Sequence, residues 1–267
     1  MRIRRSAAIV LRQFYLLRGS PARILPLFAW VAIDMVLWGF ITRYLNSVAS
    51  AGFNFVPALL GAVLLWDFFI RVMQGVTTAF FEDVWSRNFL NFFATPLAIS
   101  EYVSGLVVSS IVTGAVGLAV MILLATLVFG LSFATYGILV IPFLCVLFLF
   151  GIALGVCATA IVLRLGPAAE WFIWPIPALI SPFAGVFYPI STLPSWMQAI
   201  SRILPPSYVF ESLRAILAHH AVPRSAWAAS IGLAILDVFL AGWLFSRVYR
   251  RAVRTGLIAR YSAETLS

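Results

Sequence analysis

The sequence predicts an all-α polytopic membrane protein with about six transmembrane helices. Hydrophobic residues make up 63% of the 267 positions and charged residues only 10%, a balance that is not typical of a soluble domain. Apolar runs of about twenty residues, the length that crosses a bilayer as a helix, recur along the chain. The eighteen basic residues are all arginines and cluster toward the two ends of the chain, beside apolar runs. This placement favours anionic lipid headgroups over nucleic acid as the partner of these charges.

Each apolar run defines an expected span. The six runs lie near residues 25–45, 54–80, 103–130, 136–163, 170–190 and 226–248. The fifth run should be kinked or broken, because proline lacks the backbone N–H that a helix needs. Its prolines are Pro175, Pro177, Pro182 and Pro189. In the fourth run, Gly151 and Gly155 form a GxxxG pattern that permits close helix packing, either within the chain or at a dimer seam.

The arginines also predict the orientation. With the N-terminus inside, thirteen arginines lie on the inside and four on the outside, and Arg71 is left within a span. The inside set is Arg2, Arg4, Arg5, Arg12, Arg18, Arg23, Arg87, Arg164, Arg247, Arg250, Arg251, Arg254 and Arg260, and the outside set is Arg43, Arg202, Arg214 and Arg224. The positive-inside rule therefore places both termini, including a basic tail at about residues 249–267, in the cytoplasm. It places residues 192–220 outside.

Residues 1–24 are expected to form an interfacial helix ahead of a transmembrane domain at residues 25–267. Apolar residues recur at alternating spacings of four and three, which is the period of one helix face, and the nearby arginines fall off this stripe. The stripe consists of Ile3, Ala7, Val10, Phe14 and Leu17. The pattern predicts a helix lying on the inner leaflet, and the alternative is a basic tail that only sets the topology.

A second amphipathic segment follows the second span, at about residues 81–95. Its apolar face includes Trp85 and Phe89, and Pro96 should end the helix. Its polar face includes Glu82, Asp83 and Arg87. Such a helix on the cytoplasmic side is either an interfacial anchor or a surface that docks into a partner.

Two segments together resemble the ABC-2 type permeases, the membrane subunits of ATP-binding-cassette exporters. The first segment consists of Glu82 and Asp83, the amphipathic helix, Thr95-Pro96 and Glu101. The second consists of Leu193, Pro194, Trp196, Pro205, Tyr208, Glu211 and Arg214, which is similar to the family's LPxW and PxxYxxExxR patterns. The resemblance covers essentially the whole chain. It departs from the family at Leu204, where asparagine is common, and at Gly105, where a basic residue is often found.

This resemblance implies a function and a set of partners. The helix at 81–95 would be the coupling helix that seats in the ATPase, with Trp85 and Phe89 as anchors and Glu82, Asp83 and Arg87 as a rim. Residues 192–220 would form two short helices that re-enter the outer leaflet. The permease would export an amphipathic or lipid-linked substrate, such as a glycan, lipid or drug, across the inner membrane of a prokaryote. It would act as a homodimer, or paired with a similar permease chain, with two copies of a cytoplasmic ATP-binding subunit.

The chain itself is expected to bind no cofactor or metal and to catalyse no reaction. It contains no lysine and therefore no P-loop lysine, so ATP and Mg²⁺ are expected on the partner subunit. His219 and His220 have no cysteine or acidic residue close by in sequence that would complete a metal site.

Asp34, Asp67, Arg71 and Asp237 fall in the interior of the expected spans, where a charge costs about 3 kcal/mol or more. Asp67 and Arg71 stand four residues apart on one helix face and can neutralise each other. Asp34 has no such neighbour in its own span, which favours either a wet cavity or an interhelical hydrogen bond. The alternative function is an ion-coupled carrier that works without an ATPase through Asp34, Asp67 and Asp237.

Overall fold

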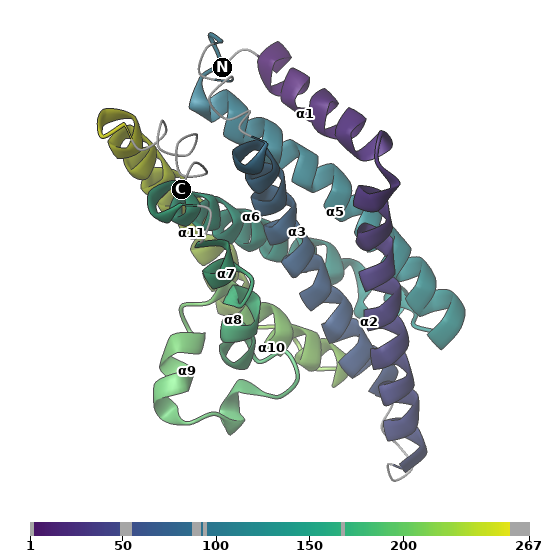
Figure 1. The fold of residues 1–267 in the computed structure, drawn as a ribbon. Helices are drawn as coiled ribbons and strands as arrows, with labels where there is room; N and C mark the ends of the chain where they lie inside the picture. Colours follow the sequence, from purple (N-terminus) through teal and green to yellow (C-terminus); the bar gives the residue numbers. More distant parts are fainter. Residues whose placement is uncertain (1–2, 49–54, 87–91, 93–94, 167–168, 257–267) are drawn as a thin grey trace.

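The computed structural model describes residues 3–48, 55–86, 92, 95–166 and 169–256 (Figure 1). These residues form helices and turns and contain no β-strand, which confirms the all-α prediction. Within the described ranges, five helices are long and apolar enough to cross a membrane. They are α2 (Pro21–Val48), α3 (Gly61–Trp85), α5 (Ile99–Phe129), α6 (Val140–Leu165) and α11 (Arg224–Arg254).

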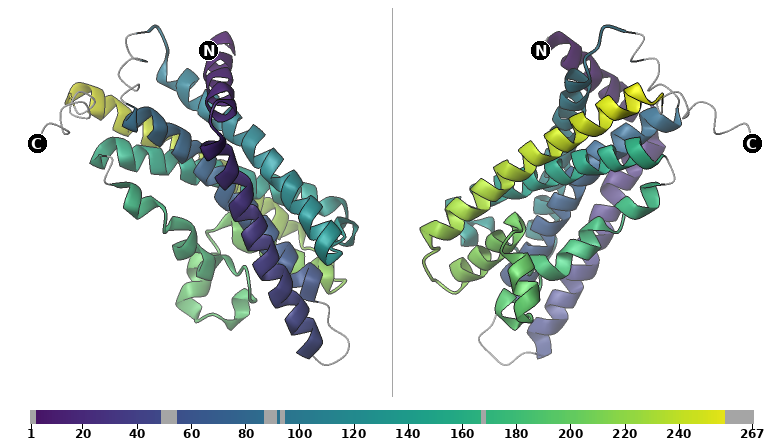
Figure 2. Two further views of the ribbon diagram at one scale, coloured as in Figure 1. Left: turned by 45° about the vertical axis from the view of Figure 1, so that its right-hand side comes forward. Right: turned by 90° about the vertical axis from the view of Figure 1, so that its left-hand side faces the viewer.

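The central helix of the bundle is α3. Its most apolar window is 61% buried inside the protein, against 19–39% for the other four long helices. It packs against α5 and α6, and α11 packs along α6 (Figure 2). A π-helical turn, η1 (Val56–Leu60), leads into α3, and a 3-10 helix, η2 (Phe133–Leu139), precedes α6. The two meet where the Tyr136 hydroxyl donates a hydrogen bond to the Pro57 carbonyl at 2.6 Å.

The span predicted at residues 170–190 is not a continuous helix. Two short helices, α7 (Glu170–Ile173) and α8 (Ile176–Ala184), take its place. Pro175 and Pro177 stand at the break between them, and neither can donate the backbone hydrogen bond that would continue α7. Both helices still run from the end of α6 toward the opposite end of the bundle (Figure 1). The six expected spans are therefore five long helices and one broken segment.

Two short helices, α9 (Ser195–Ser201) and α10 (Pro205–Leu217), follow the single 3-10 turn η4 (Ile190–Thr192). The residues that connect α9 and α10 are Arg202–Leu204. α10 packs into the bundle against α6, α8 and α11, whereas α9 lies at the edge beside α8. The sequence expected two short helices here, and their entry into the outer leaflet stays a prediction.

The N-terminal segment forms a helix of its own, α1 (Ile3–Arg18), which Gly19 and Ser20 separate from α2. α1 packs on α5 at the end of the bundle that lies away from α9 and α10 (Figures 1 and 2). The first long helix begins at Pro21, four residues before the expected span. Proline is well suited to this position because its fixed backbone angle matches a helix and its missing N–H is not needed there.

The GxxxG pattern in α6 packs within the chain. A Cβ atom added to Gly155 would lie 2.9 Å from the Met73 carbonyl oxygen of α3, and one added to Gly151 would lie 3.0 Å from the Val72 side chain. Both distances are shorter than an ordinary contact, so these glycines allow α6 to approach the backbone of α3 closely.

Candidate functional site

The acidic pair of the predicted coupling segment lies in the last turn of α3. No helix-breaking residue separates the second span from Glu82 and Asp83, so α3 continues through Trp85. The segment from residue 81 is therefore not a separate helix at its start. Arg87 and Phe89, with the other residues at 87–91 and 93–94, lie outside the described residues.

Side chains in the last turn of α3 differ widely in solvent exposure. Asp83 is completely buried, whereas Trp85 is 53% exposed. Phe81 is also buried, and its ring stacks on Trp85 at 5.6 Å between centroids. Among the described residues expected to contact an ATPase, Trp85 is thus the one with a large exposed apolar surface.

Three arginines of the N-terminal segment pair with three carboxylates around this turn. Arg12 Nη2 lies 2.5 Å from Asp83 Oδ1. Arg5 Nη1 lies 3.3 Å from Glu101 Oε2, and Arg23 Nε lies 3.4 Å from Glu82 Oε1. Arg5 and Arg12 lie on α1 and Arg23 lies on α2, whereas the carboxylates come from the end of α3 and the start of α5, so the pairs join four separate elements.

Sequence reasoning missed these partnerships. It assigned Arg5, Arg12 and Arg23 to lipid headgroups, and it assigned Glu82 and Asp83 to a docking rim. A signal was present, because Glu82, Asp83 and Glu101 are acidic residues that were expected on the same side of the membrane as the arginine-rich N-terminus. Opposite charges that share one membrane surface are candidates for pairing, but the sequence does not say which pairs form.

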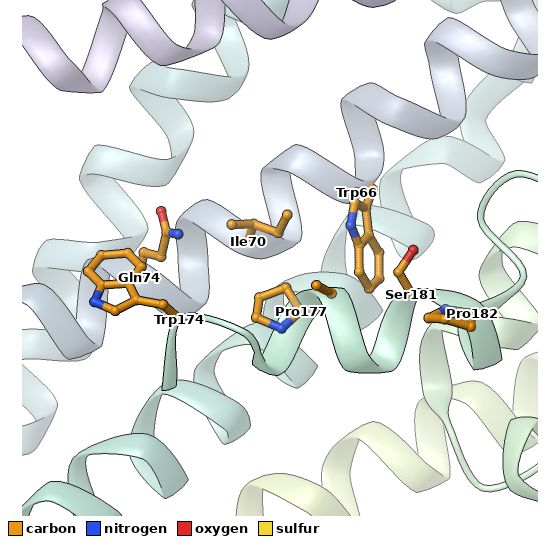
Figure 3. Close-up of a pocket in the computed structure, with 8 residues that line it drawn as sticks. Trp66, Ile70, Gln74, Trp174, Pro177, Ser181 and Pro182 are labelled. Atoms are coloured by element: carbon orange, nitrogen blue, oxygen red, sulfur yellow. The ribbon is translucent and has the colours of Figure 1, made fainter. Parts of the chain in front are cut away.

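An open cavity of about 420 Å³ lies between α3 and the broken segment (Figure 3). Trp66, Ile70 and Gln74 stand four residues apart on one face of α3 and form one wall. The other wall consists of Trp174, Pro177, Ala178, Ser181 and Pro182. The lining is mostly apolar, with the Gln74 amide near one end and the Ser181 hydroxyl near the other.

Three of the four intramembrane ionisable residues come together between α2 and α3. Asp34 interacts electrostatically with both Arg71 and Asp67, so the aspartate that lacked a partner in its own span finds one on the next helix. Gly117 of α5 makes room for the arginine, since a Cβ there would lie 3.3 Å from Arg71 Cδ. Asp237 lies apart from this cluster on α11, within electrostatic reach of Cys157 on α6.

Residues of the LPxW and PxxYxxExxR patterns, which lie between α8 and α11, take part in hydrogen bonds that connect the short helices. Glu211 Oε1 accepts hydrogen bonds from the Ile190 backbone N–H at 2.6 Å and from Arg214 Nη2 at 2.9 Å. The Tyr208 hydroxyl donates to the Arg202 carbonyl at 2.8 Å. Glu211 thereby fixes η4 onto α10, and Tyr208 closes the turn between α9 and α10.

The helices α9 and α10 have different environments. Pro194 stands immediately before α9, and Trp196 on its first turn is 60% exposed. Pro205 is buried at the first position of α10. α9 therefore presents apolar surface outward, whereas α10 is anchored in the bundle.

The described residues contain no group of three or more His, Cys, Asp or Glu side chains that could hold a metal ion.

Four long apolar helices and a broken segment, with the long central helix α3, define a multi-pass membrane protein. The sequence matches the ABC-2 type transporter family over residues 8–218, and the chain belongs to this family. It is therefore an ABC-type permease, and its family implies association with an ATP-binding subunit. No curated protein matches the sequence.

Proposed function

We propose that this chain is the membrane subunit of an exporter that moves an amphipathic or lipid-linked substrate out of the cytoplasm of a prokaryote. Two copies of the chain would pair as a homodimer and bind two copies of a cytoplasmic ATP-binding subunit, which hydrolyses ATP with Mg²⁺. The family match carries the proposal. The absence of lysine from the sequence supports ATP hydrolysis on another chain.

The cavity between α3 and α8 supports an amphipathic substrate. Trp66, Ile70 and the prolines of α8 offer apolar contact area, and Gln74 and Ser181 offer a small number of hydrogen-bonding groups. Binding sites for small molecules commonly combine a mostly apolar wall with a few polar groups that fix orientation. A glycan on a lipid carrier, a lipid and an amphipathic drug all match this chemistry.

Purification of the tagged permease from its native membrane tests the function. We expect an ATP-binding subunit to accompany it, and we expect the reconstituted complex to hydrolyse ATP. Mass measurement of the intact complex should give two permease chains and two ATP-binding subunits. A permease that transports in the absence of ATP and purifies without an ATPase would contradict the proposal.

Trp85 is the proposed anchor for the ATP-binding subunit. Its half-exposed ring stands at the end of α3, and exposed aromatic residues often dominate the binding energy of an interface. Glu82, which pairs with Arg23, is a proposed rim residue, whereas Asp83 is completely buried and pairs with Arg12. Trp85→Ala should weaken binding of the ATP-binding subunit by about 2 kcal/mol in a pull-down titration.

Trp196→Ala provides the matched control for this experiment. Trp196 is similarly exposed but lies on α9, at the other end of the bundle. Its replacement should leave ATPase binding unchanged. Equal binding by the wild type and the Trp85→Ala variant would remove the end of α3 as the docking surface.

A further inference from the structure

The amphipathic helix α1 turns its polar face toward the protein. Ser6, Ile9 and Gln13 are its buried residues, whereas Ile3 and Phe14 of the apolar stripe are exposed. This arrangement is the reverse of a helix on a soluble protein, where the apolar face is buried. Hydrogen bonds and ion pairs, rather than apolar burial alone, must therefore hold α1 in place.

A close helix crossing brings these polar groups into range. A Cβ atom at Gly105 of α5 would lie 2.6 Å from the Ile9 side chain and 3.1 Å from the Ser6 carbonyl oxygen. One turn away, the Ser6 hydroxyl donates to the Glu101 carbonyl at 3.1 Å and lies 2.8 Å from the Ser104 hydroxyl. A larger residue at position 105 would push α1 away from α5 and lengthen these contacts.

Arg12 occupies the centre of the contact. Its guanidinium pairs with Asp83 at the end of α3 and lies 5.0 Å from the centre of the Phe92 ring. The Tyr102 hydroxyl of α5 donates to the other Asp83 oxygen at 2.7 Å. One buried carboxylate therefore joins α1, α3 and α5.

A second pair repeats the connection two helical turns away. Arg5 stands seven residues before Arg12 and so lies on the same face of α1. It pairs with Glu101 and also donates to the Pro96 carbonyl. Glu101 in turn accepts a hydrogen bond from the Ala98 N–H at 3.1 Å, which caps the start of α5. Arg5 therefore binds the start of α5, and Arg12 binds the end of α3.

The complete burial of Asp83 makes the loss of its arginine partner costly. A carboxylate with no solvent exposure is costly unless it is paired and hydrogen-bonded, and removal of its partner leaves that cost uncompensated. The Arg5–Glu101 pair is nearly as shielded, because Glu101 is 5% exposed and Arg5 is 30% exposed against 26% for Arg12. It differs in what it joins, since Arg5 contacts only the start of α5.

We propose that α1 is a strap that fixes the end of α3 against the start of α5, with Arg12 as its positioning residue. The two helix ends flank the segment that the family places against the ATP-binding subunit. The strap therefore fixes the position in which the end of α3 presents Trp85 to the ATP-binding subunit. This part of the inference rests on the proposed function. The contact between α1, α3 and α5 belongs to the permease and exists without a partner.

Amide hydrogen exchange on the permease alone, in detergent, tests the strap. Arg12→Gln removes the charge and keeps a long polar side chain. Exchange at residues 82–86 and 98–104 should become about tenfold faster or more, because a broken buried pair strongly favours local opening. Arg4→Gln is the matched control, since Arg4 is an exposed arginine on the same helix. It should leave this exchange unchanged.

Two further variants separate positioning from folding. Arg12→Lys keeps the charge and should restore most of the slow exchange, which loss of packing alone would not explain. Arg5→Gln should accelerate exchange at residues 98–104 more than at residues 82–86, because Arg5 binds only the start of α5. It also provides the test if Arg12→Gln does not fold. Exchange in the folded variants that matches the Arg4→Gln control would overturn the strap.

ATPase binding then tests the consequence for coupling. Arg12→Gln should weaken pull-down of the ATP-binding subunit at least about fivefold, with recovery in Arg12→Lys, because the helix ends no longer hold one position. Faster exchange with unchanged ATPase binding would overturn the positioning role. If no ATPase accompanies even the wild type, the proposed function fails, and the exchange measurement alone decides the strap.

Discussion

Glu211 is the residue that joins the 3-10 turn η4 to α10. Its carboxylate accepts from both the Ile190 N–H and Arg214, so its loss leaves two donors without that acceptor. Glu211→Ala should therefore lower the free energy of unfolding by about 1 kcal/mol. Glu211→Gln, which retains one acceptor oxygen, should cost less. Thermal unfolding in detergent measures both variants.

Arg214 should matter more than a nearby arginine without such a contact. We expect Arg214→Ala to reduce transport more than Arg224→Ala, since Arg224 is exposed at the first position of α11. The assay compares ATP-dependent transport in vesicles with equal amounts of each variant. Equal transport and equal stability in both variants would show that the pair on α10 has no such role.

At the scale of helices, the close approach of α6 to α3 makes a stability prediction. Gly155→Ala places a methyl group against the backbone of α3 and should cost about 1–3 kcal/mol, because neither backbone can move without disturbing the core. Gly232→Ala on α11 is the control, since a Cβ there meets open space. It should be neutral or stabilising by up to about 1 kcal/mol through helix propensity. A neutral Gly155→Ala would argue against tight α3–α6 packing.

The long helices were predictable because their signal is local. Leu-, Val- and Phe-rich runs identify α2, α3, α5, α6 and α11, and the prolines at 175 and 177 identify the break between α7 and α8. Boundaries were less accurate: α3 extends five residues beyond its expected end, because nothing between Phe80 and Trp85 terminates a helix.

The contacts between elements could not be predicted in the same way. Arg12 and Asp83 stand 71 positions apart, and either could have paired with water, lipid or another side chain. The location of Asp34 near Arg71 likewise depends on how α2 rotates against α3. Gly105 departed from the family pattern, but its purpose became visible only with Ile9 packed above it.

For the whole molecule, the orientation in the membrane gives the broadest prediction. Cys145 and Cys157 are first replaced, and single cysteines are then introduced at Ser195, the first residue of α9, and at Thr255, just after α11. In intact cells an impermeant thiol reagent should label the Ser195 variant and spare the Thr255 variant, because the arginine distribution places these ends on opposite sides. Permeabilised cells should allow both reactions. Labelling of Thr255 alone in intact cells would invert the topology.

The arginine–carboxylate pairs also have a consequence for biosynthesis. The ribosome makes Arg5 and Arg12 long before it makes Asp83 and Glu101, so these arginines enter the nascent chain as unpaired positive charges. At that stage they can retain the N-terminus on the inner side of the membrane while the first hairpin inserts. Once the third long helix has been synthesised, the same charges form ion pairs between helices. In the predicted orientation, their contribution to topology precedes their contribution to packing, and we expect their neutralisation to affect the insertion of newly made chains as well as the stability of finished ones.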